Sequence, residues 1–109
     1  MSARVSGQGE MRTPGDIDQA IHAPARLIMM TYLFVVESAD FLFLMRMTGL
    51  TWGNLSTHLS KLEEAGYVAI EKTYQGKKPL TVARMTDVGR EAFRAYKKNM
   101  QRLLADLPE

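Results

Sequence analysis

The stretch LTWGNLSTHLSKLEEAGYVAI, residues 50–70, decides which fold this chain adopts. At 100° per residue, Trp52, Leu55, Leu59 and Leu62 fall on one side of a helix, which predicts that this side faces the core. The opposite side collects small or polar residues and a single charge: Gly53, Asn54, Thr57, Ser60 and Lys61. Solvent-facing sides of helices usually mix Glu and Lys, whereas no acid appears here before Glu63. We therefore expect this polar side to face a partner other than water.

The flanking residues predict where this helix begins and what precedes it. Thr51 is a good N-cap and Gly66 fits the left-handed position after a helix, so we expect the helix over about 51–65. Upstream, Asp40 caps a short apolar helix that reaches about Met47, and Gly49 supplies a turn. Two helices joined by a short turn with glycine have the outline of a helix-turn-helix, which many unrelated helical hairpins also satisfy.

Two strands and a long helix are expected after this pair. The segments YVAIEKTYQ (67–75) and LTVARM (80–85) alternate between apolar and polar residues, and GKKP (76–79) forms a turn between them, which predicts a β-hairpin. A last helix begins at Thr86 or Asp87 and keeps apolar residues at helical spacing.

The segment before the helix pair is expected to form a first helix from Pro24 to just before Ser38. It is apolar nearly all round. A helix without a polar face needs cover on more than one side, and in so short a chain a second subunit is a reasonable source of that cover.

Length and composition predict one domain over residues 16–107, preceded by a flexible polar tail over 1–15. The longest apolar run has ten residues, too short for a bilayer, and the start has no signal-peptide core, so we expect a cytoplasmic protein without membrane contact. With no cysteine and two histidines, we expect no disulfide, metal or cofactor. No catalytic motif is present, so we expect a protein that is not an enzyme.

Positive charge is concentrated in the second half of the chain. The whole chain has a net charge of +2, and residues 72–86 contain four basic residues and no acid. This distribution predicts a positive patch around the hairpin.

The segments GNLSTHLSKLEEAGYV (53–68) and GKKPLTVARMTDVGR (76–90) carry a resemblance. Over residues 21–107 the chain resembles small winged-helix transcriptional regulators related to the MarR and ArsR families. The resemblance implies a mostly α (α+β) fold, a winged helix-turn-helix with a two-stranded β-hairpin wing and a long C-terminal helix.

It also implies sequence-specific binding to double-stranded DNA. The helix over 51–65 would enter the major groove, and the wing over 75–79 would lie along the backbone or minor groove. The DNA-binding residues implied in this way are Thr51, Trp52, Gly53, Asn54, Ser56, Thr57, Lys61, Lys72, Lys77, Lys78 and Arg84.

We interpret the protein as a homodimeric regulator, and as a repressor in preference to an activator. We expect the two subunits to pair through their first and last helices. The expected interface residues are Leu27, Met30, Phe34, Phe93, Tyr96, Met100, Leu103 and Leu104. A small apolar effector between the subunits is a further hypothesis. The alternative is a winged-helix module that binds another protein without DNA. Two single features also have plainer explanations: a polar helix side that is only solvated, and wing lysines that only keep an edge hairpin from pairing with neighbours.

Overall fold

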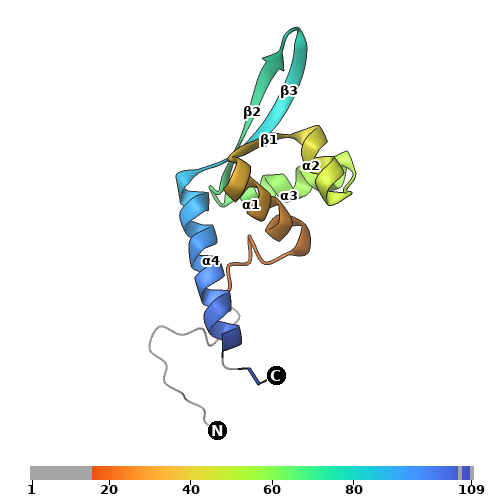
Figure 1. The fold of residues 1–109 in the computed structure, drawn as a ribbon. Helices are drawn as coiled ribbons and strands as arrows, with labels where there is room; N and C mark the ends of the chain where they lie inside the picture. Colours follow the sequence, from red (N-terminus) through yellow and green to blue (C-terminus); the bar gives the residue numbers. More distant parts are fainter. Residues whose placement is uncertain (1–15, 106, 109) are drawn as a thin grey trace.

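The computed structural model describes residues 16–105, 107 and 108, so the predicted tail over 1–15 lies outside the described residues. Four helices and three strands follow one another along the chain (Figure 1). Their bounds are α1 Pro24–Val36, β1 Ser38–Asp40, α2 Phe41–Thr48, α3 Trp52–Glu64, β2 Val68–Gln75, β3 Lys78–Met85 and α4 Asp87–Ala105. The hairpin of β2 and β3 and the helix α4 project from opposite ends of the body formed by α1, α2 and α3 (Figure 1).

The helix pair α2 and α3 forms where its caps predict. The Asp40 carboxylate accepts a hydrogen bond from the Phe43 N–H at 2.8 Å and so begins α2. Gly49 takes the left-handed conformation, with φ of 71°, and ends α2. The Thr51 hydroxyl accepts from the Asn54 N–H at 3.2 Å and begins α3. Each cap satisfies a backbone group that the helix leaves unpaired, which confirms the predicted helix pair.

The sheet has three antiparallel strands in the order β1-β3-β2, one more than predicted. β1 pairs with the base of β3, with Ser38 opposite Arg84 and Asp40 opposite Val82. The Met85 N–H donates to the Glu37 carbonyl at 2.9 Å just beyond this pairing. Three residues are too few to show a period of two, so this strand could not be recognised from local sequence.

The turn of the hairpin is shorter than the predicted 76–79. Gln75 pairs with Lys78, which leaves only Gly76 and Lys77 in the turn, and Gly76 has a φ of 65°. Pro79 therefore lies inside β3, opposite Tyr74. Its missing N–H breaks no ladder because β1 reaches only as far as Val82 and leaves this part of β3 at an edge.

The core confirms the predicted apolar side of α3, except at its first residue. Leu55, Leu59 and Leu62 are fully buried, against apolar residues from every other element of the body. Trp52, predicted to face the core, is 49% exposed. It lies at the end of the core, where the Phe41 ring covers it from one side with centroids 5.0 Å apart.

The start of α4 is packed tightly against the chain before β2. The Thr86 hydroxyl donates to the Gly66 carbonyl at 2.6 Å and accepts from the Gly89 N–H at 2.9 Å. A Cβ atom on Gly89 would lie 2.1 Å from the Tyr67 carbonyl oxygen, so this position requires glycine. The contact sets the direction in which α4 leaves the body.

Candidate nucleic-acid interface

The polar side of α3 is exposed along its whole length. Gly53, Asn54, Thr57 and Lys61 are exposed on this side; outside it, Trp52 is also exposed and Ser56 is half-buried. The Asn54 side-chain amide makes no hydrogen bond within the part of the chain that the structure describes, so both its donor and its acceptor are available. An amide that presents one donor and one acceptor can pair in two places with the edge of an adenine.

Thr57 and Gly53 are linked on this side. The Thr57 hydroxyl donates to the Gly53 carbonyl at 3.0 Å. That bond fixes the hydroxyl proton and leaves the hydroxyl oxygen as an acceptor beside the side-chain methyl. No atom lies within 4 Å of where a Gly53 Cβ would stand, so Gly53 is small without being crowded, and its backbone is open to close approach by a ligand.

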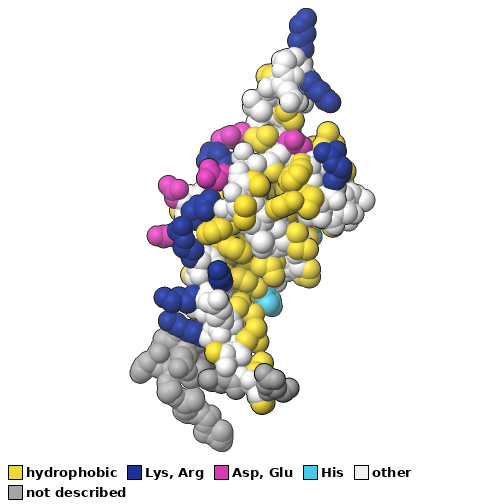
Figure 2. Space-filling model, in the orientation of Figure 1, with side chains coloured by type: hydrophobic (Ala, Val, Ile, Leu, Met, Phe, Trp, Pro, Cys, Tyr) yellow, Lys and Arg dark blue, Asp and Glu magenta, His cyan; other side chains and the backbone are white. Residues whose placement is uncertain are grey.

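The hairpin presents its lysines at the tip. Lys77 lies in the turn and Lys78 begins β3, and both are exposed. Figure 2 shows Lys and Arg side chains gathered at the tip, away from any acidic side chain on this face. Two adjacent cations on a projecting, solvated loop suit a polyanion with regularly spaced charges.

The other two predicted basic residues of the hairpin, Lys72 and Arg84, do not form one patch with the lysines at the tip. Arg84 lies opposite Ala69 and Lys72 lies opposite Thr81, so they occupy opposite faces of the hairpin. Arg84 donates to the Glu71 carboxylate at 2.7 Å, and this hydrogen bond lowers the pKa of Glu71 from its usual value. The prediction for Arg84 did not foresee that its charge is engaged by an acid on the same hairpin.

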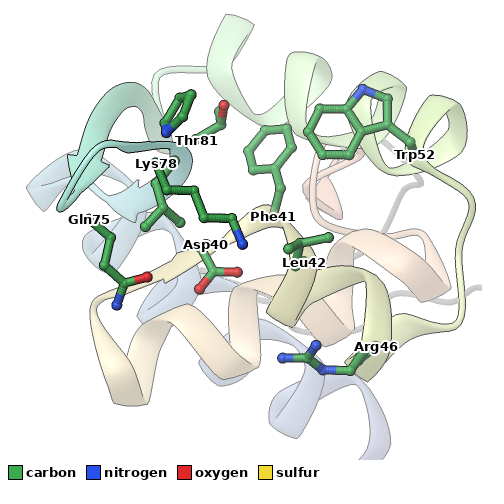
Figure 3. Close-up of a pocket in the computed structure, with 10 residues that line it drawn as sticks. Asp40, Phe41, Leu42, Arg46, Trp52, Gln75, Lys78 and Thr81 are labelled. Carbon is green, nitrogen blue, oxygen red and sulfur yellow. The ribbon is translucent and has the colours of Figure 1, made fainter.

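A pocket of about 320 Å³ joins the hairpin to the helix pair (Figure 3). Lys78 extends into it from the hairpin, Arg46 lines it from α2, and Trp52 with Phe41 forms its aromatic wall. Residues of α2, of the first turn of α3 and of the hairpin therefore border one recess. Arg46 was not among the predicted site residues, although its place on the first helix of the pair pointed to it.

A contact from α1 reaches the flank of α3. The Arg26 guanidinium lies 3.1 Å from Nδ1 of His58, and it also donates to the carbonyls of Ala20 at 2.6 Å and Gln19 at 3.2 Å. Burial, then the positive charges of Arg26 and Lys61, lower the pKa of His58 below 6.5. The ring is therefore neutral at pH 7. Because a guanidinium only donates, Nδ1 is the acceptor and Nε2 carries the proton.

The predicted interface residues on α1 and α4 differ in how much surface they expose. Leu103 and Leu104 are exposed, and Leu27, Phe93 and Met100 are half-buried. Met30 and Tyr96 are buried inside the single chain and offer almost no surface to a second copy. Phe34 is half-buried and partly covered by the guanidinium of Arg90, 4.5 Å above its ring. The large apolar residues that α1 exposes, Ile28, Val35 and Val36, are not among the predicted interface residues.

Among the described residues, no three His, Cys, Asp or Glu side chains come together in a way that could hold a metal ion. None of the described helices combines the length and the apolar character needed to cross a bilayer.

Comparison with known proteins places this geometry in a family. The family described as winged helix DNA-binding domain matches residues 25–104. An uncharacterized protein of Methanocaldococcus jannaschii is 37% identical over 71 residues, which are 65% of this chain and 77% of that protein.

Solved structures of other proteins share the fold of this chain. A transcriptional regulator homologue from Pyrococcus horikoshii OT3 superposes with a TM-score of 0.77 at 29% identity, over 83% of this chain and 91% of that chain. NadR in complex with 4-hydroxyphenylacetate superposes with a TM-score of 0.65 at 18% identity, over 81% of this chain and 62% of that chain, which shows a shared fold. The predicted winged-helix fold is thereby confirmed.

Proposed function

Because the chain belongs to the family of winged helix DNA-binding domains, we propose that it is a homodimeric transcriptional repressor that reads double-stranded DNA with α3 and holds the backbone with the hairpin. The resemblance to regulators of the MarR and ArsR type is confirmed by the matching structures, which include a possible transcriptional regulator for arsenical resistance. Sequence-specific reading, repression and dimerisation are the parts that we propose.

One observation carries the proposal. Trp52, the first residue of α3, lines one pocket together with Arg46 of α2 and Lys78 of the hairpin, and the exposed polar residues of α3 begin directly after Trp52. A groove-reading helix and a backbone-holding wing must act on the same stretch of duplex, so their adjacency is what DNA binding requires. A module that binds protein alone needs neither the unpaired Asn54 amide nor the two cations at the tip.

Roles follow from the chemistry of each side chain. Asn54 and Thr57 would read base edges, and the N–H groups of the first turn of α3 would meet a phosphate. Lys61, Lys77 and Lys78 would neutralise backbone charge, with Thr51, Trp52, Gly53 and Ser56 at the helix surface around them. Lys72 and Arg84 would contribute weaker backbone contacts from the two faces of the hairpin.

Dimerisation would place two copies of α3 about one DNA turn apart on a pseudo-palindromic site. The apolar residues exposed on α1 and on the end of α4 support this arrangement, since Ile28, Val35, Leu103 and Leu104 are each at least 44% exposed. Figure 2 shows a broad hydrophobic area over α1 beside α4. Apolar surface of this extent is what a symmetric partner would cover.

The decisive experiment measures binding by fluorescence anisotropy to a random duplex and to a site enriched from a random pool, at two salt concentrations. Asn54→Ala should weaken the enriched site by about 1–3 kcal/mol and leave the random duplex nearly unchanged. Lys78→Ala should weaken both evenly and reduce the salt slope by about 0.9, whereas the charge-matched control Lys97→Ala on α4 should do neither. Absence of salt-dependent binding by the wild type at low salt would favour a protein partner instead.

A small apolar effector is proposed for a pocket at the start of α1. This pocket has a volume of about 410 Å³ and is lined by His22, Ala23, Pro24, Leu27 and Ile28. NadR, a structural neighbour, was solved with 4-hydroxyphenylacetate. A thermal-shift screen of small apolar compounds, aromatic ones included, should find a compound that stabilises the wild type and not Ile28→Asp. A screen without a stabilising compound contradicts this part of the proposal.

A further inference from the structure

Arg26 occupies a position that its own helix disfavours. It is the third residue of α1, in a first turn that contains no acid and follows an N-cap without a side-chain bond. A cation at this end of a helix opposes the helix dipole. A residue that breaks a local rule is held by something else in the structure, and here three hydrogen bonds hold it.

The three bonds tie together segments that are distant in sequence. Nε and one Nη donate to the Ala20 and Gln19 carbonyls, and the other Nη donates to Nδ1 of His58 on α3. The segment over residues 18–22 is itself anchored. The Tyr67 hydroxyl donates to the Asp18 carboxylate at 2.5 Å, and His22 Nδ1 lies 2.9 Å from the Tyr96 hydroxyl. Through Arg26, the ring of His58 is therefore linked to a segment that is itself held in place by hydrogen bonds.

Resting on the proposed function, we propose that Arg26 is a positioning residue of the DNA-reading surface, which fixes the His58 ring and the flank of α3 against the backbone of residues 19 and 20. His58 lies one turn after Asn54 and next to Thr57, so a change in its packing moves the residues that face the groove. Arg26 acts through His58 and contacts no base itself.

The same contact keeps positive charge off the histidine. The charged groups that act on His58 are Arg26 from α1 and Lys61 from its own helix, and both oppose its protonation, as does burial. Arg46 on α2 and Glu71 and Lys72 on β2, the other elements packed on α3, are not among them. An imidazolium on a DNA-reading helix would add affinity for phosphate as the pH falls. With Arg26 in place, this gain in affinity should begin at a lower pH than it would without the guanidinium.

The test compares Arg26→Gln with Arg90→Gln in the full chain. Arg90 tethers the other end of α1, where its guanidinium donates to the Phe34 carbonyl at 3.2 Å, so both variants lose one charge and a tether of α1. Only Arg26 touches α3. Nitrogen NMR of the two histidine rings, with His22→Asn for assignment, follows the titration of His58 in free protein, and anisotropy follows DNA affinity at pH 7.5 and 6.

In Arg26→Gln we expect the pKa of His58 to rise and affinity for the enriched site at pH 7.5 to fall about three- to thirtyfold. We also expect affinity to recover in part at pH 6, a dependence that a loss of stability alone would not create. Arg90→Gln should show none of these changes at the same oligomeric state, checked by sedimentation. Arg26→Lys keeps the positive charge but loses the several N–H donors of the guanidinium, so its DNA affinity and its His58 pKa should lie between those of wild type and Arg26→Gln. It replaces Arg26→Gln in the comparison if that variant does not fold.

The inference is overturned if His58 titrates alike in Arg26→Gln and Arg90→Gln, or if the two variants lose DNA affinity equally. Failure of the wild type to bind any enriched duplex is a different result. It rejects the proposed function, and the NMR titration still decides whether Arg26 governs the state of His58.

Discussion

At the scale of single residues, Gly89 is the most closely approached of the described glycines. Gly89→Ala would place a methyl group 2.1 Å from the Tyr67 carbonyl oxygen, and this clash with backbone cannot relax by a side-chain rotation. We expect the free energy of unfolding to fall by about 3 kcal/mol or more, despite the gain in helix propensity. Urea unfolding followed by circular dichroism measures this loss.

The matched control is Gly53→Ala, also in a first turn of a helix but with no atom within 4 Å of the new methyl. Its free energy of unfolding should stay the same or rise by less than about 1 kcal/mol. Equal urea midpoints for Gly89→Ala and the wild type would show that the approach of α4 to Tyr67 is looser than described.

A second prediction concerns Tyr67 at high pH. Burial and the hydrogen bond to Asp18 raise the pKa of Tyr67 from 10.0 to about 12. Between these values the unfolded tyrosine has lost its proton while the folded one keeps it, so stability is full below pH 10 and declines as the pH rises toward 12. Tyr67→Phe should flatten this decline and remove one late-titrating tyrosine from the absorbance titration at 295 nm. An unchanged titration curve contradicts the assignment.

The sequence predicted which residues α3 exposes better than it predicted their pairings. Asn54, Thr57 and Lys61 are exposed on α3 as helical periodicity requires, because one strong period determines which side faces out. The contact between Arg26 and His58 joins positions 32 residues apart, so no local sequence pattern predicts it. Arg84 is similar, because its pairing with Glu71 depends on the register of the hairpin, which the sequence alone did not supply.

At the scale of elements, the ion pair between Arg84 and Glu71 bears on the proposed DNA contact of the hairpin. In Glu71→Gln, Arg84 loses its carboxylate partner and becomes free to meet a phosphate. The pair is exposed, so the melting temperature should hardly change. DNA affinity should rise, and the salt slope should steepen by about 0.9 if one more phosphate is neutralised. An unchanged slope would remove Arg84 from the DNA-binding residues.

The elements themselves were largely predictable, and the exceptions share a cause. Caps and periodicity placed α1, α2, α3, α4 and the hairpin, since each is specified by residues within a few positions. β1 was missed because its partner strand lies more than 40 residues away. Trp52 was assigned to the core because periodicity says which side a residue takes, and not whether the core extends that far along the helix.

At the scale of the whole molecule, the proposed dimer can be tested by placing a charge on the exposed apolar surface. Leu104→Glu near the end of α4 should shift the protein toward monomer and weaken binding to a pseudo-palindromic site more than to a half-site. Val88→Glu is the control, because Val88 has similar exposure, at 59% against 53%, and lies on a different side of the same helix. Sedimentation velocity distinguishes the two, and identical behaviour of both variants would argue against this interface.

β1 also sets the mechanics of the whole chain. By pairing with β3 and leading directly into the cap of α2, it joins the hairpin base to the helix pair, so the two move as one body. Beyond this pairing, residues 78–81 of β3 and their partners 72–75 of β2 project by about 13 Å at roughly 3.3 Å per residue. The hairpin is then a lever arm, and a rotation of about 5° at its base displaces the tip by about 1 Å. In the proposed DNA complex, a small tilt of one protomer would shift Lys77 and Lys78 relative to the phosphates while α3, near the pivot, stays almost in place.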